Sequence, residues 1–263
     1  MSEEPIDRRE RRRVLMELEA EIDGLPVHEV AISQLAKMKV LVQPMALDEK
    51  SDIKPLFFIP YQSYPELDDD AVERNYPDLG GEQASQKWGI RTEPVDAARR
   101  LELYLSDYTR TWKYIEYVSD PLWTGKCIGD YSVYKDLYQY PQPEFGVSRM
   151  TNIDGKEYPH SKVVSYNNLN GNDHELLRGE LLIILRLMLG QLRKRRLLEH
   201  MMAPVLLFSL MGPQHARAIE AYYDGKNLIL RTTKLYDFRT KNVQGLKDFA
   251  EWYRGNPIGD TTR

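Results

Sequence analysis

The chain has 263 residues, of which 42% are hydrophobic and 29% are charged, a composition typical of a folded, water-soluble domain. Lys and Arg number 36 and Asp and Glu number 40, so the net charge of -4 excludes a protein that coats nucleic acid through bulk positive charge. Cys127 is the only cysteine, which excludes a disulfide framework and any multi-cysteine zinc or iron–sulfur site and fits a reducing, cytoplasmic setting.

The N-terminal stretch is rich in arginine, and a charged pattern follows it where a secretory signal would be apolar. Acidic residues interrupt the arginines, which is unlike a transit peptide. We expect a helix that begins in residues 1–20 as a frayed, charged arm, with a nucleic-acid-binding arm or nuclear address as the alternative, and that breaks at Gly24-Leu25-Pro26. The most apolar windows, 181–189 and 205–211, are far shorter than the roughly 20 residues that span a bilayer, so no membrane partner is expected.

Three segments with different sequence patterns follow one another between residues 51 and 172. The apolar run from Pro55 to Pro60 predicts a short buried strand or a docking segment. Residues 94–120 predict a helix, because Pro94 suits a first helical turn and good helix formers follow it. Residues 121–172 lose the helical periodicity and are rich in Gly, Pro, Asn and Asp, which predicts strands joined by long loops.

An aromatic band begins within the helix expected at 94–120. Tyr104, Tyr108 and Trp112 recur at steps of four residues, which places them on one helical face. We expect most of this face to lie in the core or to form a pocket wall, while a minority of the aromatic side chains could stack on a ring or a guanidinium.

The C-terminal third has the clearest pattern. Apolar residues from His174 to His200 recur at steps of three and four, which predicts a long helix. The run from Pro204 to Gly212 is apolar on both faces, as in a strand buried within a sheet. Two further strands joined by a turn at Asp224-Gly225-Lys226, and then a closing helix, are predicted at 216–223, 227–235 and 246–254. This order predicts a single domain of the mixed α/β class, with a central sheet flanked by helices.

A cluster of acids lies at Asp68-Asp69-Asp70-Ala71-Val72-Glu73. On a helix, Glu73 would share a face with Asp69, four residues before it, and with Asp70, three residues before it. Carboxylates this close repel each other, which raises the pKa of one of them toward that of a general base, and they suit a guanidinium or ammonium group. The alternatives are an acidic helical turn stabilised by the helix dipole and, with weaker support, a metal site.

Basic residues mark the expected helix at 174–200. From Arg178 to His200 there are six bases and two acids, and we expect the bases to contact the phosphates of a nucleic acid. The alternative is a solvated end of a helix, where cations offset the helix dipole. The candidate residues are Arg186, Arg193, Lys194, Arg195 and Arg196.

Several common motifs are absent from the sequence. There is no phosphate-binding loop, no dinucleotide-binding fingerprint and no nucleophile elbow, so neither ATP hydrolysis nor a dinucleotide cofactor is expected. The five histidines lack the spacing of paired ligands, so no metal is expected either.

At Asp69-Asp70-Ala71-Val72-Glu73 the sequence resembles the arginine-containing cyclodipeptide synthases of fungi, whose characteristic motif is D-D-x-x-E. The block from Pro204 to Phe238 is similar to a segment common in small fungal proteins. The resemblance implies a cytoplasmic enzyme of secondary metabolism that condenses arginyl-tRNA with a second aminoacyl-tRNA to an arginine-containing diketopiperazine. It implies Asp69, Asp70 and Glu73 as the catalytic residues, with Glu73 as the base and the aspartates binding the cation, and it implies no cofactor and no stable protein partner.

The features of the sequence agree with that reaction. An aminoacyl-tRNA is already an activated ester, so the enzyme needs no ATP motif. The acidic cluster offers carboxylates to a guanidinium or an α-amine, the basic residues offer contacts to tRNA phosphates, and the aromatic band offers a wall for the second side chain. Cyclisation then requires that the second amine is held close to the remaining ester.

Two other functions compete with this one. Glu180, Glu220 and Lys234 follow the helix–strand–strand–strand order of restriction-endonuclease-like nucleases, although no D/E-x-K triplet lies on the third strand. The second competing function is that of a non-catalytic interaction protein, in which the acidic and basic segments are solvated faces or a docking pair. Ser209 is a conceivable nucleophile, but a serine buried within a strand is the stronger interpretation.

Overall fold

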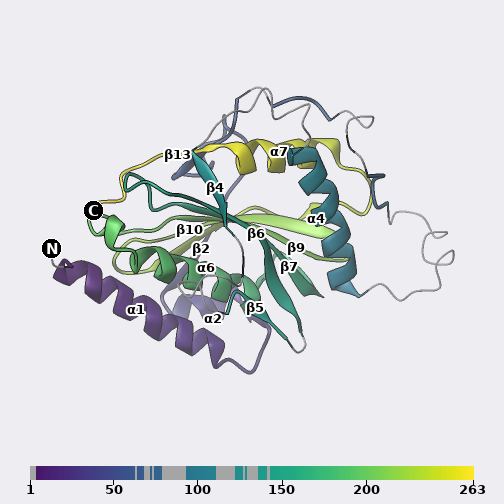
Figure 1. Cartoon of the computed structure of the whole chain (residues 1–263). Coiled ribbons are helices and arrows are strands. Elements are labelled where there is room, and N and C mark those ends of the chain that lie inside the picture. The colour runs from purple at the N-terminus through teal and green to yellow at the C-terminus, as the bar shows by residue number, and fades with distance from the viewer. Residues whose placement is uncertain are drawn as a thin grey trace.

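The computed structural model describes residues 4–62, 64–67, 72, 74–78, 93–110, 122–126, 128, 136–140 and 143–263. Asp69, Asp70 and Glu73 of the acidic motif lie outside these residues, as does Trp112. In the described part of the chain a mixed sheet lies between helices on both of its faces (Figure 1). The predicted fold class, a single mixed α/β domain with a central sheet, is confirmed.

The central sheet has nine strands within the described residues. Along its path lie, in order, β2 (Val40–Pro44), β11 (Leu228–Thr232), β10 (His215–Tyr223), β9 (Val205–Gly212), β7 (Ser161–Asn170), β6 (Phe145–Ile153) and β4 (Trp123–Lys126). Off this path, β10 also pairs with β12 (Tyr236–Asp237) and β6 with β5 (Tyr138–Gln139). Neighbouring strands are antiparallel, except that β2 is parallel to β11 and β7 is parallel to β9.

Strand β9 lies in the middle of the sheet, and all eight of its residues are buried. A strand covered on both faces needs apolar side chains in both directions, which is the pattern that predicted it. The turn at Asp224-Gly225-Lys226 joins β10 to β11 as expected, since the Asp224 carboxylate accepts hydrogen bonds from the backbone N–H groups of Lys226 and Asn227. The three-strand meander of the C-terminal third is therefore confirmed.

Helices α1 (Ile6–Asp23) and α6 (Arg178–Leu192) lie on one face of the sheet, which we call the α6 face. Helices α4 (Pro94–Arg110) and α7 (Val243–Arg254) lie on the other, the α7 face (Figure 1). The remaining elements are short: α2 (Ile32–Lys37), the 3-10 helix η1 (Arg195–Leu197), β1 (Glu29–Ala31) paired with β8 (Glu175–Leu177), and β3 (Phe58–Ile59) paired with β13 (Asn256–Pro257). None of the described helices has both the length and the apolar character needed to cross a bilayer.

Each face of the sheet has its own hydrophobic core. On the α6 face, α6 is enclosed between the sheet and α1, which explains why every residue of α6 except Arg186 is buried. On the α7 face, Tyr104 and Tyr108 of α4 are buried beside Phe249 and Trp252 of α7. The expected aromatic face thus lies in the core for its two described members.

The helix expected before the break at Gly24 is present as α1, which includes Ile6–Ala20 of the charged arm. Leu15, Leu18 and Ile22 follow helical spacing and bury one stripe of α1 against α6. Arg8 is only 1% exposed, because its Nε donates to the His200 carbonyl at 2.9 Å and its Nη1 pairs with Glu4 at 2.7 Å. The arginine-rich start of the chain is therefore largely structural.

The long helix expected from His174 to His200 is shorter in the structure. It is preceded by β8 and ends at Leu192, and Arg193 to Arg196 follow it in a turn and in η1. The continuous apolar pattern spanned both a strand and a helix, since a short buried strand and a buried helical turn look alike in sequence. The basic residues therefore do not form a stripe along one helix.

Candidate functional site

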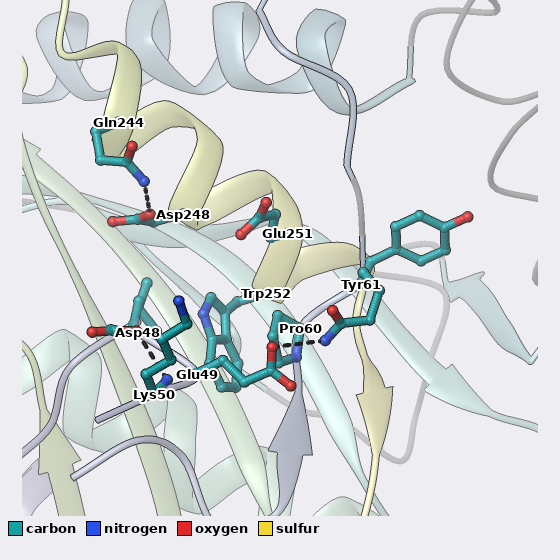
Figure 2. A pocket seen from close by; sticks show the side chains of 11 residues that line it. Asp48, Glu49, Lys50, Pro60, Tyr61, Gln244, Asp248, Glu251 and Trp252 are labelled. Carbon is teal, nitrogen blue, oxygen red and sulfur yellow. Dashed lines mark hydrogen bonds between the residues drawn. The ribbon is translucent and has the colours of Figure 1, made fainter. Parts of the chain in front are cut away.

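A pocket of about 430 Å³ lies beside α7 on the α7 face of the sheet. Three segments that are far apart in the sequence line it: the loop after β2, the segment after β3, and one side of α7 (Figure 2). Its volume lies within the roughly 300–1,000 Å³ that is usual for pockets that bind small molecules. The lining residues are Leu47, Asp48, Glu49, Lys50, Pro60, Tyr61, Gln62, Gln244, Asp248, Glu251 and Trp252.

Helix α7 supplies the polar side of the pocket. Gln244, Asp248 and Glu251 are spaced four and three residues apart, so they share one face of the helix. The opposite face is anchored in the core by Leu246 and Phe249. The amphipathic pattern that buries one side of α7 thus presents the carboxylates on the other side to the pocket.

Asp248 is held in place by two donors. Gln244 Nε2 donates to its carboxylate at 2.6 Å, and the hydroxyl of Tyr236 donates to it at 3.2 Å. Burial nevertheless raises the pKa of Asp248 above its ordinary value, because desolvation disfavours the charged form more than these hydrogen bonds favour it. A cation that entered the pocket would stabilise the ionised carboxylate.

Glu251 lies one helical turn beyond Asp248, and Figure 2 shows both side chains on the same side of α7. Burial raises the pKa of Glu251, and the negative charges of Asp248, Glu66 and Glu49 raise it further, against the opposing effect of Lys247. Its carboxylate makes no hydrogen bond or ion pair with another residue in the described part of the chain. Glu251 is therefore a partly buried carboxylate whose surroundings favour an added positive charge.

The loop after β2 completes the acidic lining with Asp48 and Glu49, and Lys50 is the one cationic residue of the lining. Glu49 accepts a hydrogen bond from Gln62 Nε2 at 2.8 Å, which ties this loop to the segment after β3. Trp252 lies between the carboxylates of α7 and the loop (Figure 2), and it forms an apolar wall. Four carboxylates thus face the pocket against one lysine.

The buried Glu220 supports the loop side of the pocket from within the sheet. Its carboxylate accepts hydrogen bonds from the backbone N–H groups of Leu56 and Phe57 at 2.7–2.9 Å and pairs with Arg231 at 3.1 Å. These bonds fix the start of the segment that runs through β3 to Pro60 and Tyr61. The apolar run between the two prolines thus contains a two-residue strand with a defined anchor, in which Phe58 is buried and Ile59 is exposed.

This arrangement suits an organic cation better than a metal ion. No group of three or more His, Cys, Asp or Glu side chains in the described residues is placed to hold a metal. A guanidinium or ammonium group is larger and can contact carboxylates that are several ångströms apart.

The predicted acidic motif lies outside the described residues, but residues on both sides of it are anchored to the α7 face. Before the motif, Glu66 forms an ion pair with Lys247 of α7. After it, Arg74 pairs with Asp107 of α4 at 2.7 Å, and the Tyr76 hydroxyl donates to the Phe238 carbonyl at 2.5 Å. The described ends of the segment that carries Asp69, Asp70 and Glu73 are thus attached to the two helices on the side of the sheet where the pocket lies.

The predicted phosphate-binding residues separate into two groups. Arg186 pairs with Glu19 at 2.7 Å and Asp23 at 3.2 Å of α1, so its charge is used in helix packing. Arg193, Lys194, Arg195 and Arg196 follow α6 and are at least partly exposed. The structure therefore brings the last four together and leaves Arg186 apart from them.

The nuclease-like set is not brought together. Glu180 lies on the α6 face, where it forms a buried ion pair with Arg217 at 2.6 Å. Glu220 lies on the same strand as Arg217 but three residues on, so its side chain points to the α7 face. Ser209 is fully buried and accepts a hydrogen bond from Asn167 Nδ2 at 3.1 Å, as expected for a serine inside a strand.

Sequence reasoning missed Asp248 and Glu251. The signal was present as two carboxylates three residues apart on a helix that was itself predicted. Nothing in the sequence favours them over other surface acids, because the loop that closes the pocket lies about 200 residues earlier in the chain.

Comparison of the chain with protein-family models, with curated proteins and with solved structures gives no match.

Proposed function

We propose that this protein is an aminoacyl-tRNA-dependent cyclodipeptide synthase, as its resemblance implies, and that the acidic pocket receives the guanidinium of the arginyl group. The observation that carries the proposal is the pocket beside α7, where four carboxylates and one lysine line a volume of about 430 Å³. Such a lining favours a cation, and the guanidinium of an arginine side chain is a cation that binds carboxylates through paired hydrogen bonds.

The proposed reaction consists of two acyl transfers. The α-amine of one aminoacyl-tRNA attacks the ester carbonyl of the other, which forms a peptide bond and releases the first tRNA. The remaining free amine then attacks the remaining ester, which closes the ring and releases the second tRNA. Each attacking amine starts as an ammonium group and must lose a proton, so the site needs a proton acceptor as well as a cation-binding group.

The two carboxylates of α7 suit these two tasks. Glu251 lacks a partner in the described chain and has a raised pKa, which are the properties of a carboxylate that accepts a proton. Asp248 is oriented by Gln244 and Tyr236, which suits a group that binds and positions a cation. Asp69, Asp70 and Glu73 stay part of the proposal as the residues that the resemblance implies.

The nuclease alternative has lost its structural basis, because Glu180 and Glu220 point to opposite faces of the sheet and each is paired with an arginine. The interaction-protein alternative differs from our proposal in one measurable way. It predicts no new product when the chain is supplied with charged tRNA, whichever carboxylates are present.

The test is to incubate the purified protein with tRNA charged with arginine and the other amino acids, and to search by mass spectrometry for an arginine-containing diketopiperazine. We expect this product from the wild-type chain and at least about tenfold less from Glu251→Gln, because a removed proton acceptor costs about that factor or more. Asp70→Asn and Glu73→Gln are measured in parallel. Glu21→Gln, an exposed acid on α1 far from the pocket in the fold, is the matched control and keeps wild-type activity.

The variants that lose the product distinguish the role of the pocket from the role of the acidic motif. Product that is lost in Glu251→Gln, with normal folding by circular dichroism, supports the pocket. Product that is lost only in Asp70→Asn and Glu73→Gln supports the resemblance but contradicts the role of the pocket. A wild-type chain that yields no arginine-containing product from any charged tRNA mixture overturns the proposed function.

A further inference from the structure

A second charged region lies at the β4 edge of the sheet. Two parts of the chain form it: the end of β4 and the segment that follows α6. We call it the basic edge and define it by five cationic residues, Lys126, Arg193, Lys194, Arg195 and Arg196.

The turn between β6 and β7 joins these two parts. Asp154 in this turn accepts from Lys126 Nζ at 2.6 Å, and Arg196 Nη1 lies 3.7 Å from the same carboxylate oxygen. Arg196 also donates to the backbone carbonyls of Ile153, at 2.8 Å, and Asp154. One carboxylate is thus shared by two cations, and the guanidinium of Arg196 is fixed by main-chain acceptors.

Lys194 lies between the cations of the basic edge and is partly buried. Burial and, to a smaller extent, the charges of Arg196 and Lys126 lower the pKa of Lys194 to about 8, against the opposing effect of Asp154. The charges of Arg196 and Lys126 thus act on Lys194 more strongly than the charge of Asp154 does, which indicates a positive potential at this lysine. An anion bound at the basic edge would relieve this repulsion.

We propose that the basic edge binds the phosphate backbone of an RNA. Three of its five cations are arginines, whose planar guanidinium groups match phosphate oxygens, and all three are exposed. An acidic membrane surface fits less well, because binding there requires apolar side chains beside the cations. In the described residues from 143 to 242 no large hydrophobic side chain is exposed.

The basic edge and the acidic pocket are on different sides of the molecule. Lys126 pairs in register with Met150, which belongs to the core of the α6 face, whereas the pocket lies on the α7 face beside the loop after β2. A ligand that contacts both sites must therefore reach around the sheet from one face to the other.

This inference deepens the proposed function and rests on it only for the choice of tRNA as the RNA. The test measures the affinity of the full chain for an uncharged arginine tRNA transcript by fluorescence anisotropy at several salt concentrations, and it needs no catalysis. The test variant is Arg193→Gln with Arg195→Gln, because both side chains are exposed and outside the core. The matched control is Arg100→Gln with Arg239→Gln, which removes two exposed arginines from outside the basic edge.

We expect the wild-type chain and the control to bind the transcript with the same salt dependence. Loss of two phosphate contacts should reduce the slope of log K against log salt by about 1.5 and should weaken binding about thirtyfold at about 0.1 M salt. Glu251→Gln should bind the uncharged transcript as the wild type does, so failure of the proposed function leaves this result unaffected.

Two results would overturn the inference. One is equal affinity and equal salt dependence in the test variant and the control. The other is binding to vesicles that contain phosphatidylserine that depends on Arg193 and Arg195 while binding to the transcript does not, which would assign the basic edge to a membrane surface.

Discussion

Two sets of carboxylates in this molecule differ in the partners that surround them. Glu180 and Glu220 lie within the core, and each is saturated by an arginine and by backbone N–H groups. Asp248 and Glu251 lie at the edge of the core, beside a pocket, where no arginine is in contact with them in the described chain. The first set fixes the fold, whereas the second leaves negative charge directed at a space that a ligand can fill.

The difference follows from the cost of burying charge. A buried carboxylate is tolerated only when a cation and hydrogen bonds replace the water that it has lost. A carboxylate that is only partly desolvated can persist without a partner, with a raised pKa, and is then available to bind or to accept a proton. The predictions below test whether the two sets really differ in this way.

The largest effect is expected from breaking the pair between Glu180 and Arg217, whose side chains are 0% and 2% exposed. Arg217→Met leaves the carboxylate of Glu180 buried without its cation, which should lower the free energy of unfolding by about 3–5 kcal/mol. Chemical denaturation measures the change. The double variant Glu180→Gln with Arg217→Met should recover part of the loss, and a loss below about 1 kcal/mol in the single variant would show that the pair does not hold α6 to the sheet.

A smaller loss is expected at Glu220, which anchors Leu56 and Phe57 through their backbone N–H groups. Glu220→Gln keeps one acceptor oxygen but removes the charge that faces Arg231, so the free energy of unfolding should fall by about 1–3 kcal/mol. Proteolysis should then cut first in the segment before β3, because its anchor is weakened. Cleavage that starts elsewhere would contradict the role of Glu220 as the anchor of the pocket loop.

Neutralising the pocket carboxylates should change stability least. Asp248→Asn and Glu251→Gln remove repulsion between neighbouring acids, so the free energy of unfolding should stay within about 0.5 kcal/mol of the wild type or rise slightly. Affinity for arginine amide, measured by calorimetry, should nevertheless fall about tenfold or more, because a charge-assisted contact is lost. Variants that lose stability as much as Glu220→Gln would indicate that these acids are structural as well.

The sequence predicted the fold well wherever one periodicity extended over a whole element. Val205–Gly212 was apolar in both directions, and Leu246 to Arg254 had a helical stripe, so β9 and α7 were expected almost at their true bounds. The helix expected at 174–200 was overextended, because β8 and the turn after Leu192 kept the same apolar spacing. Periodicity alone does not mark such boundaries.

The pocket could not be predicted from the sequence. Its walls come from Leu47–Lys50, Pro60–Gln62 and Gln244–Trp252, and only the topology of the sheet places β2, β3 and α7 side by side. The same holds for the basic edge, where the turn that carries Asp154 brings Lys126 to Lys194 and Arg196. Arg186 is the opposite case. Its charge predicted a contact with a ligand, but in the structure it pairs with Glu19 of α1.

The affinity of the pocket for a cation should also depend on pH. Burial and the charges of neighbouring acids raise the pKa of Glu251 above its ordinary value of 4.5, so the carboxylate is protonated to a higher pH than an exposed acid. Affinity for arginine amide should therefore fall, as the pH is lowered from neutral, before an exposed carboxylate would titrate. Calorimetry at a series of pH values measures this, and an affinity that is constant until ordinary acids titrate would contradict it.

The same shift has a consequence for stability. Between the ordinary pKa and the raised pKa, the folded chain holds the proton on Glu251 while the unfolded chain has released it, so stability falls as the pH rises through this window. Denaturation curves of the wild type and Glu251→Gln should therefore diverge with rising pH, in favour of the variant. Parallel pH profiles would show that Glu251 titrates alike in the folded and unfolded chains.

The proposed function requires that the pocket beside α7 recognises the positive charge of an arginine side chain. Calorimetric titration with arginine amide and with citrulline amide, which has nearly the same shape but no charge on the side chain, measures this recognition. We predict that the wild-type chain binds arginine amide at least about tenfold more tightly, and that Asp248→Asn loses most of this preference. Equal affinity of the wild-type chain for the two amides would contradict the claim.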